Sequence, residues 1–455
     1  MLNLPHSILA VLIHFLPLFS KPTYIKLLQL FSAHILCTNK RTISNCLRLI
    51  GLNDERKYSK FYDVFRRANW SSFKASKILL QLITREWVAG KSLLIIVDTT
   101  LERRRGPKIH GLGIHRDAAR STKGRKAFSP GHSWLVACVV IRFPGTKVSW
   151  SLPFISILLR PENALSSSKN IRDQNRKVRH KKVTQYTAQL VCLLRRWLGP
   201  EKKLILIGDS AFCCRSICKA CINHNITFCA SFRWNASLYA PAEAKKRKGR
   251  KALTGERLPN LDVTACAPDT LWKLFTVRWY GGKTREVKLA TGTAIWYHSS
   301  SKIRIPIRWV ISNSSTDIGN ALPILCTNPS LSEEEIVSLF VQRWSIETTF
   351  QEVRSNLGYE SVSTWSDKSI ERVSPSILAS YSIVCLIASR SVSDTGQNIE
   401  PISSAWYQKQ HITFSDVLSY VKSLIVRENI FPHPLERYKV RKNIIYEVLY
   451  WAIAA

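Results

Sequence analysis

The chain has 455 residues, too many for one ordinary hydrophobic core, so two or three domains are expected. Hydrophobic residues make up 45% of it, which excludes an intrinsically disordered chain. Lysine and arginine number 67 against 31 aspartate and glutamate residues, a formal net charge of +36. This excess of positive charge favours binding to a polyanion. Nucleic acid is therefore the first partner to consider, and an anionic membrane surface is the second. A basic composition shared by all proteins of the source organism is the alternative.

The first apolar run, residues 8–19, is predicted to form the first buried helix and not a targeting segment. No lysine or arginine precedes it, Pro17 interrupts it, and no small-residue cleavage pattern follows it. It is also too short to cross a bilayer. No other uninterrupted apolar run approaches transmembrane length, so we expect a soluble protein with no membrane partner.

Residues 1–88 carry helical patterns without a convincing strand, and we expect a helical N-terminal DNA-binding region there. Apolar residues recur at three- and four-residue spacing in residues 24–36, and Thr42 can cap a second, short helix. Two short helices joined in this way resemble a helix-turn-helix, with Lys40 and Arg41 available for phosphates. Any small helical bundle contains such turns, so a purely structural bundle is the alternative.

Residues 89–233 change to strand patterns and are predicted to form the first part of a catalytic core. Three short strands come first, and strands then alternate with helices in the order β-β-β-α-β-α-β. That order matches the start of an RNase H-like α/β fold.

Two of these predicted strands, SLLIIVD and KKLILIGD, are apolar runs that end in an acid, Asp98 in the first and Asp209 in the second. A buried carboxylate without a partner is costly, whereas strand ends in an α/β sheet are the usual place for a ligand site. If the two strands are neighbours, their carboxylates can share a metal ion. The alternative for each aspartate is a cap on the following turn or helix, which suits Asp209 followed by Ser210.

The rest of the chain divides into three segments. Residues 234–326 contain strand-like pieces and are predicted to be an all-β insertion that interrupts the core. Helical patterns return in residues 327–392, the second part of the core, where Ser332 and Glu335 can form a capping box. Residues 393–455 are expected to form a helical C-terminal region.

Twelve cysteines are scattered through the chain, mostly inside apolar runs, which is typical of reduced thiols in an intracellular protein. The exception is the stretch CCRSICKACINH, where a Cys-x-x-Cys next to a histidine offers zinc ligands. No second ligand pair with good spacing follows, and three of these cysteines recur at helical spacing, which favours a buried helix face. The cluster comprises Cys213, Cys214, Cys218, Cys221 and His224.

The segment RWSIETTFQEVR offers two more carboxylates, Glu347 and Glu352. At about 100° per residue, Glu347 lies on the same side of the predicted helix as Arg343 and at the edge of the buried face. Glu352 lies on the opposite side and is expected to face solvent. Glu347 is therefore the candidate for chemistry, and an ordinary Arg–Glu salt bridge on a solvated helix face is the alternative.

The spacing of Phe340, Arg343, Glu347 and Arg354 resembles the Tyr-Arg-Glu-Lys signature of bacterial insertion-sequence DDE transposases. The stretches IVDTT, IGDSAF, RWSIETTFQEVRSNLG and STWSDKSIERVSPSIL also resemble that family, as do the RWYGG and PIRWV pieces of the insertion. These motifs occur in the family's order over nearly the whole chain. Two positions depart from the signature: Phe340 replaces tyrosine and keeps only packing, and Arg354 replaces lysine and binds phosphate with a different geometry.

This resemblance implies a site of three carboxylates, with Asp98, Asp209 and Glu347 matching the catalytic DDE triad. In such enzymes the triad holds two Mg²⁺ or Mn²⁺ ions, and hard oxygen ligands suit those ions. Arg343 matches the signature arginine, which is expected to hold a phosphate near the scissile bond or to orient Glu347. The predicted DNA-binding residues are Arg343, Arg354, Phe340, Lys40, Arg41, Lys245, Lys246, Arg247 and Lys248.

The implied function is cut-and-paste DNA transposition: cleavage at the terminal inverted repeats of an element and strand transfer into target DNA. The expected setting is the bacterial cytoplasm, on the nucleoid, with a homodimer in the synaptic complex. Basic clusters in residues 103–105, 169–182 and 245–251 would line the DNA path. A transposase-derived DNA-binding protein that no longer cleaves, and an RNase H-like nuclease without strand transfer, are the alternatives.

Overall fold

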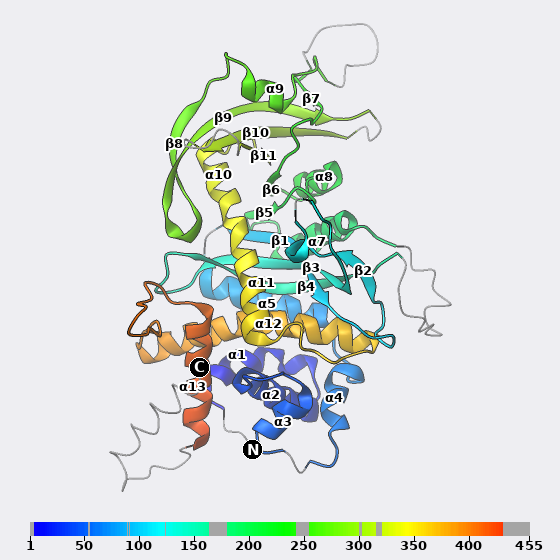
Figure 1. The fold of residues 1–455 in the computed structure, drawn as a ribbon, viewed down its shortest axis with the longest axis vertical. Helices are drawn as coiled ribbons and strands as arrows, with labels where there is room; N and C mark the ends of the chain where they lie inside the picture. The colour runs from blue at the N-terminus through cyan, green and yellow to red at the C-terminus, as the bar shows by residue number, and fades with distance from the viewer. Residues whose placement is uncertain are drawn as a thin grey trace.

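Figure 1 shows a layered molecule, with the N-terminal helices at one end, a large sheet across the middle and a curved set of strands at the other end. It is a computed structural model. The residues that it describes are 4–52, 55–88, 90, 92–122, 124–162, 180–242, 254–299, 303–314 and 321–430.

The N-terminal region is a bundle of helices. The hydroxyl of Thr42 accepts a hydrogen bond from the backbone N–H of Asn45 at 3.2 Å, so the predicted cap on a short second helix is confirmed. Pro17 lies in the 3-10 turn where the first apolar run leaves the α-helical conformation. The helices are α1 (His6–Leu12), the 3-10 helix η1 (Ile13–Leu18), α2 (Lys21–Leu36), α3 (Ile43–Leu49), α4 (Ser59–Arg66) and α5 (Ser72–Trp87).

A mixed, 11-stranded sheet extends from the middle of the molecule to the end opposite the N-terminal helices (Figure 1), in the order β2-β3-β1-β5-β6-β11-β10-β9-β7, with β4 paired to β3 and β8 to β9. The β1–β5 and β5–β6 pairs are parallel and the other pairs antiparallel. Strand β2 is missing from the predicted order, because four residues are too few to show alternation. The strands are β1 (Leu93–Arg103), β2 (Gly113–Arg116), β3 (Phe128–Arg142), β4 (Ser149–Leu159), β5 (Leu204–Gly208), β6 (Ile226–Ser231), β7 (Leu238–Tyr239), β8 (Lys273–Arg278), β9 (Thr284–Tyr297), β10 (Arg304–Ser314) and β11 (Leu322–Cys326).

The segment expected to be an all-β insertion continues the central sheet, because β11 pairs with β6. The all-β expectation is wrong at the six-residue helix α9 (Leu261–Cys266), whose Leu261 is buried in the main core. Six residues give too little of a helical period to be read in the sequence. A 3-10 turn, η3 (Tyr280–Gly282), joins β8 to β9.

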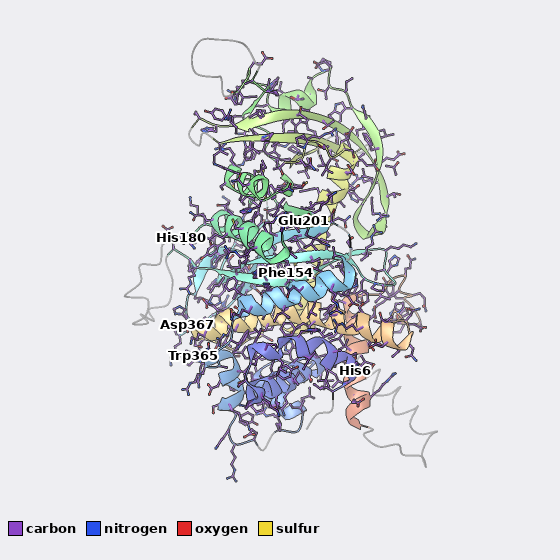
Figure 2. The ribbon with its side chains drawn as sticks, turned by 180° about the vertical axis from the view of Figure 1, so that it is seen from behind. His6, Phe154, His180, Glu201, Trp365 and Asp367 are labelled. Carbon is purple, nitrogen blue, oxygen red and sulfur yellow. The ribbon has the colours of Figure 1, made fainter. Side chains whose placement is uncertain are left out.

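Helices cover the faces of the sheet. On one side, α5 and α12 (Asp367–Thr395) pack against β4, and Phe154 of β4 is only 2% exposed there (Figure 2). Helix α7 (Val183–Leu198) packs on β3, and α8 (Arg215–Asn223) packs on β6 and against α7. A 3-10 turn, η2 (Ala118–Arg120), follows β2.

Helix α12 is the one described helix whose length and apolar composition would allow it to cross a membrane. It lies between the sheet and the N-terminal helices (Figure 1), and 72% of its most apolar stretch is buried inside the fold. Burial of that kind is what the central helix of a layered core requires, and it accounts for the apolar composition.

The C-terminal region departs from the expected run of helices. Gly396 adopts a left-handed conformation, with φ +67, and ends α12. Residues 397–413 then follow without a helix, and α13 (Phe414–Ile430) packs against α12 and α2. Residues 431–455, also predicted to be helical, lie outside the described residues.

Candidate active site

The two aspartates predicted to end strands lie on neighbouring parallel strands. Asp98 is in β1, and Asp209 directly follows β5. The β1–β5 register pairs Ile96 with Ile207, so continuing it by two residues brings Asp98 level with Asp209. The condition for a shared site is therefore met. However, β1 does not end at Asp98 but continues to Arg103, because β3 pairs with it as far as that residue.

Asp98 occupies an electrostatically unfavourable place for a carboxylate. Its side chain is 15% exposed, and its Oδ1 accepts the backbone N–H of Thr99 at 2.7 Å. Burial, together with the nearby charges of Asp209 and Glu347, raises the pKa of Asp98 to about 7, against the opposing effects of the Thr99 N–H and the Arg343 guanidinium. A bound cation would relieve this repulsion.

Asp209 also serves the local turn. Its Oδ1 accepts the backbone N–H of Ala211 at 2.9 Å, which is the turn-capping role proposed as the alternative for this residue. One carboxylate oxygen engaged in this way fixes the orientation of the side chain, and the second oxygen is still able to act as a ligand. The cap and a ligand role are therefore compatible.

The predicted helix that carries Glu347 is built from three pieces: α10 (Glu333–Val341), the 3-10 turn η4 (Gln342–Trp344) and α11 (Ser345–Leu357). The capping box of Ser332 and Glu335 is confirmed at its start, and Gly358, with φ +65, ends it. The hydroxyl of Thr349 donates to the backbone oxygen of Ser151 at 2.8 Å and fixes α11 against β4. Helix α11 thus reaches the sheet in a fixed orientation.

Arg343 connects the carboxylates of the two elements. Its Nη1 lies 3.0 Å from Oε1 of Glu347, one helical turn away, and 3.7 Å from Oδ2 of Asp98 on β1. The side chains of Arg343 and Glu347 are 18% and 37% exposed, so the pair lies at the edge of the buried face, as the helical spacing predicted. The structure therefore brings Asp98, Glu347 and Arg343 together, with the Asp209 charge close enough to affect Asp98.

The carboxylates of this site suit a divalent cation in their chemistry. All three are hard oxygen donors, and the pKa of Asp98 is raised first by burial and then by the like charges of Asp209 and Glu347. In the described part of the chain, no three acidic, histidine or cysteine side chains form a group that could hold a metal ion as they stand. Since Nη1 of Arg343 lies between Asp98 and Glu347, these carboxylates would have to exchange the guanidinium for the cation.

The cysteine cluster forms part of the core. Cys213, Cys218 and Cys221 are buried, and burial raises the pKa of all three thiols, which disfavours the thiolate that zinc requires. His224 instead contacts Cys192 of α7, with Nε2 3.1 Å from Sγ. Of the three cysteines at helical spacing, Cys218 and Cys221 thus lie on the buried face of α8, whereas Cys214 is its half-buried N-cap.

Glu352 was predicted to face solvent, and this prediction is wrong. It is half-buried on the far side of α11, where it lines a cavity of about 370 Å³ between that helix, the β8–β9 turn and residues 411–414. Burial raises its pKa, and Nδ2 of Asn356 donates to its Oε2 at 2.6 Å. The prediction failed because the helical period shows in which direction a side chain points, but not which other segments of the protein lie in that direction.

Several predicted DNA-binding residues have other roles in the fold. Phe340 is 6% exposed and packs in the main core. Arg41 is half-buried and donates to the backbone oxygen of His34 at 3.3 Å, whereas Lys40 is exposed. Arg104 is 5% exposed, so it cannot line a DNA path. Residues 245–251, which include Lys245, Lys246, Arg247 and Lys248, and residues 169–179 lie outside the described residues.

The buried position of Arg104 is explained by its partner. Nη1 of Arg104 donates to Glu102 at 2.9 Å, and Glu102 also accepts hydrogen bonds from Trp134 and Ser374. The charge is thus neutralised inside the core. A basic run in a sequence cannot show which of its members find such a partner.

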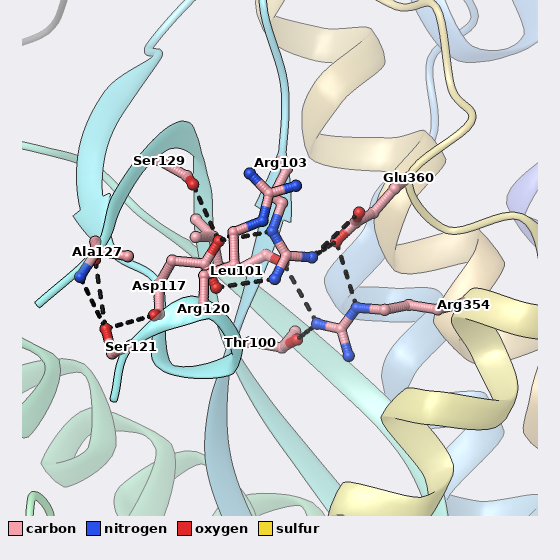
Figure 3. A network of polar contacts seen from close by, with 10 residues as sticks. All are labelled: Thr100, Leu101, Arg103, Asp117, Arg120, Ser121, Ala127, Ser129, Arg354 and Glu360. Atoms are coloured by element: carbon pink, nitrogen blue, oxygen red, sulfur yellow. Dashed lines mark hydrogen bonds and ion pairs between the residues drawn. The ribbon is translucent and has the colours of Figure 1, made fainter. Parts of the chain in front are cut away.

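Arg354 belongs to a polar network beside the carboxylates (Figure 3). Its guanidinium binds Glu360, the hydroxyl of Thr100 and the backbone oxygen of Leu101. Glu360 also accepts a hydrogen bond from Arg103, and the guanidinium of Arg103 donates two further hydrogen bonds to Asp117. Sequence reasoning missed Glu360 and Asp117, and nothing in their local spacing distinguishes them from surface acids.

Comparison with known proteins gives one family. The family model described as "DDE superfamily endonuclease" matches residues 14–286, more than half of the chain, which include Asp98 and Asp209. No curated protein matches the sequence. A solved structure of the piggyBac transposase synaptic complex with hairpin DNA is similar, at 11% identity and a TM-score of 0.41, over 93% of this chain and 76% of that chain. The family match shows that this chain belongs to the DDE superfamily endonucleases.

Proposed function

We propose that this protein is a DDE transposase that cuts the ends of its own element and transfers them into target DNA. The observation that carries the proposal is that Arg343 bridges Asp98 to Glu347 of α11, while Asp209 follows the parallel strand next to that of Asp98. The family match supports endonuclease chemistry, and the Phe340-Arg343-Glu347-Arg354 spacing supports the transposase assignment.

In this proposal Asp98, Asp209 and Glu347 hold two Mg²⁺ or Mn²⁺ ions, and their core has an RNase H-like topology. The chemistry that such ions supply is activation of the attacking oxygen, first of water and then of a DNA 3′-hydroxyl, and neutralisation of charge on the leaving oxygen. The protein supplies the carboxylates, their spacing and their partial exclusion from water. No covalent protein–DNA intermediate is needed.

Arg343 has two successive roles in this proposal. Before the cations bind, its guanidinium compensates the charges of Asp98 and Glu347. If the carboxylates held cations, the same guanidinium would be available to a phosphate next to the scissile bond, for which its planar fork is well suited. The exchange keeps the charge of the site compensated at both stages.

The charge of the chain supports DNA as the partner. A net charge of +36 gives a strong, sequence-independent attraction for phosphate, and exposed basic residues such as Lys40 and Arg105 are available to it. The proposal includes binding of the terminal inverted repeats and of target DNA by a homodimer. It also includes an origin in a bacterial insertion sequence and a location on the nucleoid, which rest on the signature spacing alone.

A cleavage and joining assay tests the proposal. The purified protein is incubated with DNA fragments that carry the sequences flanking its gene, with Mg²⁺, Mn²⁺ or EDTA, and with a labelled target plasmid. Divalent-dependent nicking at one defined position and joining of the 3′ end to the plasmid are expected. Nicking without joining would indicate a nuclease, and binding without nicking would indicate a DNA-binding protein derived from a transposase.

A further inference from the structure

Arg354 ties the helix that carries Glu347 to the strand that carries Asp98. Its Nη2 donates to the hydroxyl of Thr100 and, at 3.3 Å, to the backbone oxygen of Leu101. The Thr100 side chain lies on the same face of β1 as Asp98, because alternate residues of a strand share a face. Arg354 lies two turns after Glu347 on the same side of α11. These hydrogen bonds therefore connect β1 and α11 beside Asp98 and Glu347, which lie on the same two elements.

Glu360 fixes the guanidinium of Arg354 in that position. The left-handed Gly358 ends α11 and turns the chain back, so that Oε1 of Glu360 lies 3.3 Å from Nε of Arg354. The same carboxylate accepts hydrogen bonds from Nη1 of Arg103 at 2.9 and 3.3 Å. Arg354 is thus bound by β1 and by Glu360, and Glu360 is in turn bound by Arg103.

The network is anchored at its far end by Asp117. Arg103 donates to Asp117 through Nε at 2.6 Å and through Nη2 at 2.8 Å, and Ser129 donates to the same carboxylate at 2.9 Å. The Asp117 side chain is 2% exposed. A chain of charged groups therefore extends from Asp117, just after β2, through Arg103 of β1 and Glu360 to Arg354 of α11 (Figure 3), and each group in it has a fixed partner.

This arrangement does not suit a residue whose only role is to contact DNA. Two nitrogens of Arg354 are bound to protein, and its side chain is 32% exposed. Its guanidinium also lies 6.0 Å from the ring centre of the buried Tyr359. A planar fork makes several such bonds at once, whereas a lysine ammonium on a flexible stem cannot hold the same set.

We propose that Arg354, held by Glu360, is a positioning residue that sets the separation of Glu347 from Asp98 and thereby the affinity of the site for divalent cations. The inference rests on the proposed metal-dependent function. It gives Arg354 a role different from the phosphate contact that the signature spacing suggested.

The test measures Mn²⁺ binding to the DNA-free protein by electron paramagnetic resonance, in which free Mn²⁺ gives the signal. Glu360→Gln keeps the shape of the side chain but weakens its hold on Arg354, and Arg354→Lys keeps the positive charge. Both variants are expected to bind Mn²⁺ more weakly, on the order of tenfold, as is typical when groups that orient metal ligands are altered. The dissociation constant for DNA is expected to stay within about twofold of the wild type, since the net charge changes little.

A matched pair elsewhere in the chain controls for general disturbance. Arg308 donates to Glu333 at 2.6 Å, to the backbone oxygen of Leu331 and to the hydroxyl of Thr291, so it has the same kinds of partner as Arg354. Glu333→Gln is expected to bind Mn²⁺ as the wild type does. Thermal unfolding of every variant shows whether the fold is retained at the assay temperature.

The outcomes separate this inference from the proposed function. If the wild type binds no Mn²⁺, the metal site itself fails. If it binds Mn²⁺ and both folded variants bind equally well, the positioning role is wrong and the proposed function stands. Normal Mn²⁺ binding with weakened DNA binding in Arg354→Ala, and recovery of DNA binding in Arg354→Lys, would assign Arg354 to phosphate and overturn the inference.

Discussion

Asp98 and Glu347 are joined through a single guanidinium nitrogen, since Nη1 of Arg343 lies 3.7 Å from the first and 3.0 Å from the second. Asp98 lies in the middle of a strand, and Glu347 lies on a helix almost two hundred and fifty residues later in the chain. A contact between such distant segments is a property of the packing of α11 on the sheet.

Glu347 and Glu352 offer a matched comparison on one helix. Glu347→Gln is expected to abolish divalent-dependent cleavage, by a factor of at least about 10³, because it removes a ligand and leaves the shape unchanged. Glu352→Gln is expected to cleave within about twofold of the wild type, since Glu352 faces the cavity on the far side of α11. Single-turnover cleavage at saturating DNA measures both. Equal activity in the two variants would show that Glu347 is not a ligand.

Arg343 is expected to affect metal binding and cleavage in opposite directions. Arg343→Ala removes the positive charge beside Asp98 and Glu347, so Mn²⁺ should bind the DNA-free protein more tightly, by roughly threefold or more. Cleavage should fall by about 10² or more, because the phosphate loses its arginine. Paramagnetic resonance and single-turnover cleavage give the two quantities. Weaker Mn²⁺ binding would instead mean that Arg343 mainly orients Glu347.

Asp117 should contribute to stability in a pH-dependent way. Two hydrogen bonds from Arg103 hold the pKa of Asp117 at about 2, below its ordinary value of 3.8. A lowered folded-state pKa stabilises the protein above the unfolded-state pKa, and this stabilisation is lost as the pH falls from about 4 to about 2. Asp117→Asn is therefore expected to lower the free energy of unfolding at pH 7 by about 2 kcal/mol.

Urea unfolding at pH 7 and at lower pH measures this difference, which should shrink as the pH approaches 2. Asp269 is exposed and provides the control, since Asp269→Asn should change the free energy of unfolding little at any pH. A difference between wild type and Asp117→Asn that stays constant down to pH 2 would show that the lost stability comes from packing and not from the charge.

DNA binding should depend steeply on salt. Each phosphate neutralised by the protein adds about 0.9 to the slope of log K against log[salt] for duplex DNA. If Lys245, Lys246, Arg247 and Lys248 contact phosphates, replacing all four by glutamine should reduce that slope by roughly 3 to 4. Binding titrations between about 50 and 200 mM salt measure the slope. An unchanged slope would remove residues 245–248 from the DNA path.

Local features of the fold could be predicted from the sequence because they depend on residues that are neighbours in the chain. Thr42 caps α3, and Ser332 with Glu335 caps α10, because a cap involves groups only a few residues apart. The all-β insertion was predicted wrongly at α9, and Glu352 was placed in solvent wrongly. Both errors concern features that a short window of sequence does not contain: a helix of six residues, and the segments that cover one face of another helix.

By itself, the sequence determined the acids that end apolar runs, the helical side shared by Arg343 and Glu347, and a charge suited to DNA. Only the tertiary structure decided that β1 and β5 are neighbours and that Arg343 lies between Asp98 and Glu347. It also decided that Arg354 is bound by Glu360 and Thr100. The physical reason is that periodicity is set by backbone geometry within a few residues, whereas the partner of a buried charge is set by which distant segments pack together.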